Sequence, residues 1–195
     1  MRAVCAAPFW HRRTRPRPAN LLHRPPLASS FTEFYGFDEQ KAILAVEKYR
    51  ERFRTVGLFE NRVFTASNRC LRTCNAGQNL AVATSKPQVF AERILEKYGL
   101  RPYFKVVVGS ELDGRRTDKA EVIEEACRQL GLGMEKRRDA VMIGDRRHDI
   151  LGAAACGMPS IGVLFGYAEP GELEAAGAGQ IAQSVPQLAA LLAGE

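Results

Sequence analysis

The stretch Ala140-Val-Met-Ile-Gly-Asp145-Arg-Arg-His-Asp149 decides the fold. Its first four residues are apolar and suit a buried strand, and the glycine after them leads into two aspartates. Ligands of an open α/β sheet bind at the carboxyl ends of its strands. We expect Asp145 at the tip of the strand and Asp149 at the start of the next helix, as its cap or first-turn acid. Two carboxylates there would suit a hard cation such as Mg²⁺, whereas the simpler alternative is a turn residue followed by an ordinary helix cap.

An alternation of strands and helices extends on both sides of this stretch. Apolar runs that suit buried strands lie at 80–84, 104–108, 140–143 and 160–164, with a possible edge strand at 180–182. Helices are expected at 87–98, 119–130, 150–156, 169–176 and 186–192. Because the strands are apolar throughout and helices separate them, the pattern predicts a parallel sheet with helices on both faces.

A small helical unit precedes the alternation. One apolar stripe at helical spacing predicts a helix between a cap at Asp38 and an end at Gly57, and it consists of Ala42, Val46, Tyr49, Phe53 and Val56. A shorter helix is expected near 28–35. Residues 63–78 show no clear period, so the sequence predicts no regular element there.

Length and charge limit the class of protein. The 195 residues, 46% of them apolar, suit a single folded domain or a core with a small accessory domain. Six of the 28 basic residues precede the first acid, Glu33, and the other 22 are balanced by 22 acids. A basic tail of this kind does not predict a nucleic-acid-binding surface, although binding through the arginines remains an alternative. Residues 1–27 are rich in Pro, Arg and His, and we expect them to be irregular.

The cysteines and one uncharged segment bear on localisation. Five irregularly spaced cysteines indicate reduced thiols of a cytoplasmic protein, and Cys70 and Cys74 lack the second ligand pair that a zinc site needs. Residues 151–168 are uncharged, but four glycines and Pro159 interrupt them, so we expect no membrane span. The sequence gives no indication of the oligomeric state.

Two further stretches suggest an anion site. Thr84 and Ser85 follow a predicted strand just before a helix begins, where hydroxyls and free backbone donors can bind an anion. Lys119 begins a helix at the same edge of the predicted sheet and could neutralise a phosphate oxygen. The alternatives are a simple capping pair at 84–85 and a solvated lysine beside Glu121.

Strand–hydroxyl, loop–lysine and strand-Gly-Asp-x-x-x-Asp, in this order, resemble motifs two, three and four of the haloacid dehalogenase (HAD) superfamily of phosphohydrolases. Segments 80–87, 109–116, 142–149 and 162–167 look like its phosphoglycolate phosphatase and 5′-nucleotidase-like branch. The resemblance implies a Rossmann-like α/β core over 63–195 and a partial, small α-helical cap over 28–62. It also implies Mg²⁺-dependent hydrolysis of a small phosphorylated metabolite, a phosphate monoester.

The resemblance also implies roles for particular residues. Thr84 would hold the transferring phosphoryl oxygen, and Lys119 would balance its charge. Asp145 would ligate Mg²⁺, with Asp149 completing or orienting the metal's ligands. Further neighbours of the substrate would be Ser85, Arg115, Arg116 and Arg146.

One family motif is missing. The nucleophile and the general acid–base of the family form an Asp-x-Asp at the end of the central strand, yet residues 1–30 contain no acid. This absence predicts a sheet that lacks its nucleophile strand, because only Val4-Cys-Ala-Ala7 could fill the gap and it is short. Two unpaired apolar edges would then make the chain marginally stable, and we expect no phosphatase activity. Glu111 and Asp113 form a similar acid pair but lie at the wrong place in the motif order.

Two explanations of the missing motif remain open. The chain could be a catalytically dead relative that binds a phosphorylated ligand or a partner. Alternatively, both the head of the chain and residues 63–78, where the family has a Leu-rich helix, could be translated in a displaced reading frame. The nucleotide sequence decides between them, because a displaced frame would encode an Asp-x-Asp strand upstream and a Leu-rich helix at 63–78.

Overall fold

The computed structural model describes residues 3–6, 10–12 and 27–194. The chain forms two compact units, one made of Met1–His11 with Val63–Glu195 and the other of Arg12–Arg62. The predicted core segment, 63–195, lies in the first unit, and the predicted cap segment, 28–62, lies in the second.

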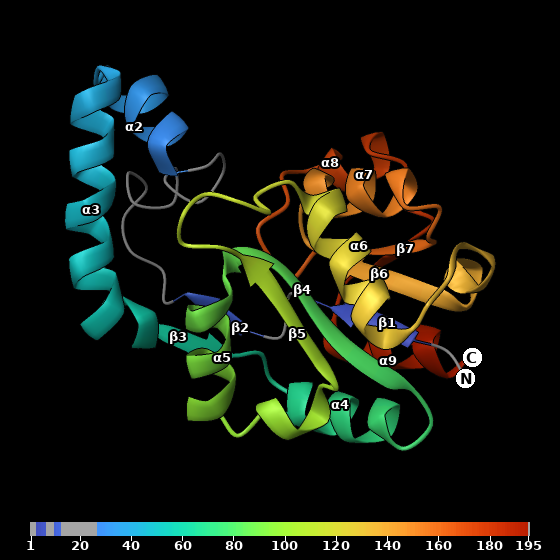
Figure 1. Cartoon of the computed structure of the whole chain (residues 1–195). Coiled ribbons are helices and arrows are strands. Elements are labelled where there is room, and N and C mark those ends of the chain that lie inside the picture. The colour runs from blue at the N-terminus through green and yellow to red at the C-terminus, as the bar shows by residue number, and fades with distance from the viewer. Residues whose placement is uncertain (1–2, 7–9, 13–26, 195) are drawn as a thin grey trace. The chain divides into compact units, whose positions relative to one another are not determined.

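The first unit is built on a six-stranded sheet in which every paired strand is parallel (Figure 1). The order is β5-β4-β1-β6-β7-β8. The strands are β1 (Ala3–Ala6), β4 (Asn79–Pro87), β5 (Val106–Ser110), β6 (Ala140–Gly144), β7 (Ser160–Val163) and β8 (Gln180–Ala182). This architecture confirms the predicted α/β class and the parallel sheet.

The expectation of a sheet without its central strand is wrong. β1 lies between β4 and β6, with Ala3 opposite both Asn79 and Ala140, and Ala6 opposite Ile143. A parallel ladder is made by backbone N–H and C=O groups, so this short segment can complete the sheet without any carboxylate. β4 and β6 are therefore paired on both sides, and the two apolar edges expected to weaken the fold do not exist in the described sheet.

The helices of the first unit follow the predicted alternation. They are α5 (Gln88–Lys97), α6 (Lys119–Leu130), α7 (Arg147–Ala155), α8 (Glu172–Ala175) and α9 (Val185–Ala193). Short 3-10 turns occupy Arg101–Tyr103 and Met134–Asp139. α6 has the predicted bounds because Asp118 caps it, accepting from Ala120 N at 2.8 Å, and Gly131 ends it at φ 68°. α6 and α7 pack against each other, as do α9 and a further helix, α4 (Ser67–Asn75) (Figure 1).

Residues 63–78, for which no element was expected, contain α4 (Ser67–Asn75). Four of its residues, Ser67, Cys70, Leu71 and Cys74, are buried and share one side of the helix. The segment did not look helical because this side has a single large apolar residue, Leu71, beside a serine and two cysteines, which count here as small apolar residues. All four cysteines whose side chains the structure describes are buried, free thiols.

The segment 1–27, which we expected to be irregular, contains two strands and the first residue of a helix where the structure describes it. β1 occupies 3–6, β2 (Trp10–Arg12) pairs with β3 (Asn61–Val63) in a two-stranded sheet, and α2 begins at Leu27. The rest of the predicted irregular segment lies outside the described residues.

Among the residues that the structure describes, the second unit contains two helices at the predicted places. They are α2 (Leu27–Tyr35) and α3 (Glu39–Thr55), followed by a 3-10 turn at Gly57–Phe59. Asp38 caps α3, accepting from Lys41 N at 2.8 Å, which confirms the predicted N-cap. The rings of Phe31, Tyr35 and Phe37 lie with centroids 5.8–5.9 Å apart at the end of α2.

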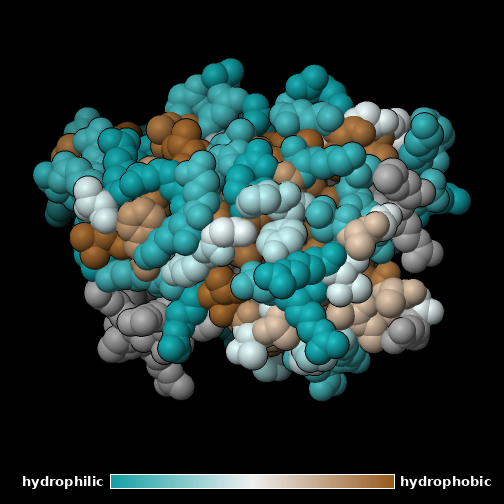
Figure 2. All heavy atoms as spheres, turned by 90° about the horizontal axis from the view of Figure 1, so that it is seen from below, coloured by the Kyte–Doolittle hydropathy of each residue, from teal (hydrophilic) through white to brown (hydrophobic). Residues whose placement is uncertain are grey.

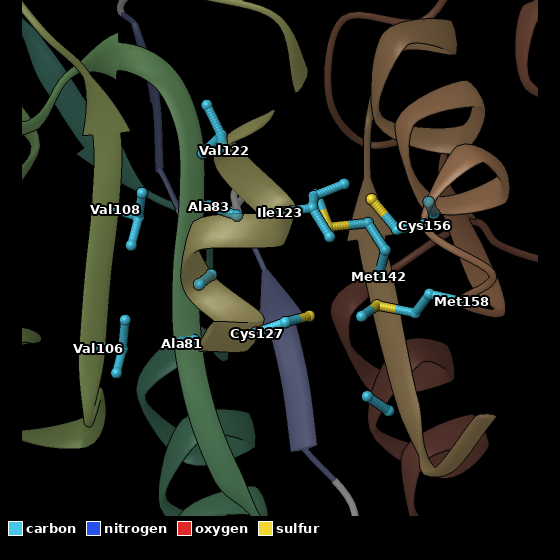
Figure 3. Close-up of a cluster of buried hydrophobic side chains, with 13 residues drawn as sticks. Ala81, Ala83, Val106, Val108, Val122, Ile123, Cys127, Met142, Cys156 and Met158 are labelled. Carbon is cyan, nitrogen blue, oxygen red and sulfur yellow. The ribbon is translucent and has the colours of Figure 1, made fainter. Parts of the chain in front are cut away.

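The core of the first unit positions the carboxyl edge of the sheet. Figure 3 shows side chains of α6, of three strands and of the end of α7 gathered in one buried cluster. Its labelled members are Ala81, Ala83, Val106, Val108, Val122, Ile123, Cys127, Met142, Cys156 and Met158. Because β4 presents two alanines to this cluster, α6 can pack close to the sheet, and its first residue is fixed beside the strand ends.

On the face drawn in Figure 2, hydrophobic side chains form separate small areas among hydrophilic ones. No described helix is both long enough and apolar enough to cross a bilayer.

Candidate functional site

A buried ion pair joins two of the predicted site residues. Lys119 Nζ lies 2.7 Å from Asp149 Oδ1, and the two side chains are 8% and 6% exposed. The same ammonium donates to Ala83 O of β4 at 3.2 Å. Lys119 therefore connects the start of α6, the first turn of α7 and the carboxyl end of β4. The alternative of a solvated lysine beside Glu121 is wrong.

Asp149 is fully engaged by donors. Besides Lys119, its carboxylate accepts through Oδ2 from the backbone amides of Asp145 at 3.1 Å and Arg146 at 3.2 Å. Asp149 is the third residue of α7, so the first-turn acid is confirmed and the simple N-cap is not. α7 begins three residues before the predicted start because this carboxylate reaches back and satisfies the amides that precede the helix.

Asp145 has the more available carboxylate. It follows β6 and accepts through Oδ2 from Tyr167 N at 3.0 Å, while Oδ1 has no hydrogen-bond partner among the described residues. Burial, reinforced by the charge of Asp149, raises the pKa of Asp145 to about 6, against the opposing effects of Tyr167 N–H, Lys119 and Arg146. A cation would bind favourably to this carboxylate, because its positive charge would stabilise the ionised form that burial destabilises.

A glycine lies against each of the three charged side chains. A Cβ at Gly144 would collide with Asp149, and one at Gly166 would collide with Asp145. A Cβ at Gly152 would lie 2.7 Å from Lys119 Cγ. In the sequence, only Gly144 stands out as a neighbour of the site, because it directly precedes Asp145. Nothing in the sequence indicates that Gly152 and Gly166 lie against charged side chains.

Thr84 and Ser85 lie where β4 reaches the same edge. Thr84 is buried, and its Oγ1 accepts from Lys86 N at 3.2 Å. Ser85 has an exposed side chain, and its carbonyl accepts from Ser110 Oγ at 2.9 Å. The N-terminus of α5 receives no side-chain cap, so the capping-pair alternative is wrong. Since Ala83 O binds Lys119, the structure brings Thr84, Lys119, Asp145 and Asp149 to one edge of the sheet.

Arg115 and Arg116 pair with acids of their own loop. Arg115 binds Glu111 at 2.5 Å and Asp113 at 2.7 Å, and Arg116 binds the other oxygen of Glu111 at 2.6 Å. Arg116 lines two surface grooves whose walls include none of Thr84, Lys119 and Asp145. Glu111 is thus neutralised by two guanidinium groups, which does not favour it as a substitute nucleophile.

The residues present fit a magnesium ion in part. Mg²⁺ in proteins is usually bound through one or two carboxylates, with water and phosphate oxygens as the remaining ligands. Asp145 can supply one such carboxylate, whereas both oxygens of Asp149 already accept from donors. No group of three or more His, Cys, Asp or Glu side chains within the described part of the chain is placed to hold a metal. Asp145 therefore fits as a ligand, and Asp149 fits as the residue that orients its loop.

The fold, the strand-end carboxylates and the buried lysine define a class of protein. The model of the haloacid dehalogenase-like hydrolases matches residues 10–163, and the chain belongs to this family. A 5′-nucleotidase of Pseudomonas aeruginosa is 47% identical over 152 residues, which cover 77% of this chain and 67% of that protein. A phosphoglycolate phosphatase of Neisseria meningitidis is 34% identical over 93 residues, covering 48% of this chain and 38% of that protein.

A solved structure agrees with this placement. A "predicted phosphatase from Clostridium acetobutylicum" has a TM-score of 0.81 and 42% identity, covering 88% of this chain and 78% of that one. The likeness to the phosphoglycolate phosphatase and 5′-nucleotidase-like branch is confirmed, as is the HAD-type fold. The chain spans about two thirds of the nucleotidase and well under half of the phosphoglycolate phosphatase.

Proposed function

We propose that this chain binds the phosphate group of a small phosphorylated metabolite, together with Mg²⁺, at the carboxyl edge of the sheet, and that it does not hydrolyse the ester. The observation that carries the proposal is the buried Lys119 ammonium between Ala83 O and Asp149, beside Thr84, in a sheet whose central strand leads into no acid. The site thus has the parts that bind a phosphate and lacks the part that attacks it.

Two donors support the binding of phosphate. An ammonium has three N–H bonds, and Lys119 uses one on Asp149 and one on Ala83 O, so the third can reach a phosphate oxygen. The Thr84 hydroxyl accepts from Lys86 N, so its own O–H is available to donate. Bonds from a charged donor to phosphate are stronger than neutral ones, and burial strengthens them further.

Asp145 would hold the metal. Its Oδ1 would bind the ion directly, while Asp149 fixes the Asp145 and Arg146 amides and so the direction of the loop. When bound, Mg²⁺ would neutralise part of the phosphate charge and orient its oxygens.

The absence of turnover follows from the residues after β1. HAD phosphatases transfer the phosphoryl group to an aspartate that follows the central strand, and a second aspartate two positions on acts as general acid and base. Here Ala7, Pro8 and Phe9 follow β1, and none of them carries a nucleophile or a titratable group. A covalent intermediate therefore has no side chain on which to form.

Calorimetry with Mg²⁺ and inorganic phosphate tests the binding. We expect both to bind, and we expect Lys119→Met to abolish phosphate binding while the control Lys136→Met, at an exposed lysine of the Met134–Asp139 turn, leaves it unchanged. A wild-type protein that binds neither ligand would refute the binding site.

An assay with nucleoside 5′-monophosphates, which the name of the nucleotidase relative suggests, and with phosphoglycolate tests the absence of turnover. We expect no release of phosphate above background. Magnesium-dependent release that disappears in Lys119→Met would overturn this part of the proposal, because it would place catalysis in this site.

A further inference from the structure

One carboxylate outside the expected set is fastened to the metal-site loop. Glu172, the first residue of α8, accepts through Oε1 from Arg146 Nε at 2.8 Å and from Arg147 N at 2.9 Å. Its other oxygen accepts from Glu169 N at 3.0 Å. The side chain is 10% exposed, so these contacts are made largely out of water. Glu172 therefore ties the start of α8 to the two residues that follow Asp145.

The position of Arg146 gives this contact a consequence for the site. Arg146 is the neighbour of Asp145 in the chain, and its charge acts on that carboxylate. Yet its guanidinium pairs with Glu172, and within the described part of the chain Asp145 forms no ion pair. The cation that neighbours the metal carboxylate in the chain is thus held by a different acid.

We propose that Glu172 is a positioning residue for the metal site: by binding Arg146 and the Arg147 amide it keeps the guanidinium off Asp145 and leaves that carboxylate open to a cation. The inference rests on the proposed metal-binding role of Asp145. The inference gives α8 a role in the metal site, although none of the family motifs found in the sequence includes a residue of α8.

Loss of the Glu172 charge has a specific physical result. The Arg146 side chain is 18% exposed, and an unpaired charge that is largely buried is costly. The guanidinium would therefore move to another carboxylate within reach, and Asp145 is the adjacent one. An arginine bound to Asp145 would compete with Mg²⁺ for the same oxygen. It would not compete with phosphate, because it adds a positive charge near that anion.

The variant Glu172→Gln tests the inference through two ligands with opposite expectations. The affinity for Mg²⁺ falls by about 10-fold, since the metal must displace a guanidinium of comparable strength. The affinity for inorganic phosphate, measured without the metal, stays the same or rises. A general loosening of the loop would weaken both ligands, so it would not produce this pattern.

Two companion variants complete the design. Glu174→Gln removes the same charge from the same short helix at an exposed residue and leaves both affinities unchanged. The double variant Glu172→Gln/Arg146→Gln removes the competing guanidinium. It restores the Mg²⁺ affinity to within about 2-fold of wild type, in contrast to the tenfold loss in the single variant. If Glu172→Gln does not fold, Glu172→Asp serves in its place, because one methylene less draws the carboxylate away from Arg146 Nε.

The outcomes separate this inference from the proposed function. A wild-type protein that binds no Mg²⁺ refutes the proposed metal site, and the crystal structure of Glu172→Gln then decides the inference by showing whether the Arg146 guanidinium lies on Asp145. Unchanged Mg²⁺ affinity in Glu172→Gln, or weak affinity that persists in the double variant, overturns the inference while the proposed function stands.

Discussion

Lys119 Nζ lies 2.7 Å from Asp149 Oδ1, and the two residues lie in the first turns of different helices. The pair fixes α6 against α7 at the same point where Asp149 fixes the loop that carries Asp145. Stability and ligand binding are therefore coupled in this part of the molecule. A buried charge without its partner is among the most destabilising changes a protein can carry, so each member of the pair makes a strong prediction.

Asp149→Asn leaves the Lys119 charge buried with only Ala83 O as a strong acceptor. We expect the free energy of unfolding to fall by about 3–5 kcal/mol, the usual result of breaking a buried ion pair from one side. Urea unfolding at pH 7 measures it. The double variant Lys119→Met/Asp149→Asn removes the stranded charge and should lose less than the sum of the two single variants. Full additivity would show that the two side chains do not interact.

The stability of the metal-free protein should depend on Asp145 in acid. The pKa of Asp145 is raised from 3.8 to about 6 by burial and by the Asp149 charge, so the folded chain holds this proton more tightly than the unfolded chain. Stability must then fall as the pH rises from about 4 to about 6, by roughly 1–3 kcal/mol. Mg²⁺ affinity should rise over the same range, because the metal binds the deprotonated acid.

Urea unfolding between pH 4 and 7 in EDTA, compared with Asp145→Asn, isolates this contribution. The free energy of unfolding of the wild type should fall between pH 4 and 6, whereas that of Asp145→Asn should not. Parallel profiles for the two proteins would mean that Asp145 is not the group whose proton is held.

Gly152→Ala should disturb the site through Lys119. The new Cβ would lie 2.7 Å from Lys119 Cγ and 3.2 Å from Ala120 N, so α6 or the lysine must move. We expect a loss of stability of about 1–3 kcal/mol, as for other overpacked positions, and weaker binding of inorganic phosphate. Thermal unfolding and calorimetry measure the two effects.

Gly77→Ala is the matched control for Gly152→Ala. A Cβ at Gly77 meets nothing within 4 Å, and Gly77 has no positive φ. This variant should leave both stability and phosphate affinity near the wild-type values. If Gly152→Ala binds phosphate as tightly as Gly77→Ala does, the close contact does not position Lys119.

Local signals explain which elements the sequence could predict. α6 was predicted to the residue because Asp118 and Gly131 mark its ends in the sequence as they do in the structure. Residues 4–7 were the only segment that could fill the central position, but the sequence did not show that they do. Strand pairing depends on backbone groups and on neighbours far away in the chain, which four small residues do not reveal. The motifs identified Lys119 and Asp149, but not the contact between them or the link from Glu172 to Arg146, which only the tertiary structure shows.

Restoring the acids after β1 should restore catalysis. The double variant Ala7→Asp/Phe9→Asp places an Asp-x-Asp, the catalytic motif that the chain lacks, directly after the central strand. If Thr84, Lys119 and Asp145 form the phosphate and metal site, these acids complete it. We expect Mg²⁺-dependent hydrolysis of p-nitrophenyl phosphate to rise from background by at least about 100-fold, the lower range of what one general acid–base contributes.

The matched control for this restoration is Ala7→Asn/Phe9→Asn, which has nearly the same shape without the carboxylates and should stay at background. Adding Lys119→Met to the active variant should remove the activity again, because the transferring phosphate would lose its buried cation. An Ala7→Asp/Phe9→Asp protein that binds Mg²⁺ and phosphate as wild type does, yet releases no product, would mean that β1 does not lead into the site. The assignment of the carboxyl edge of β1 to the reaction would then be wrong, even though the strand completes the sheet.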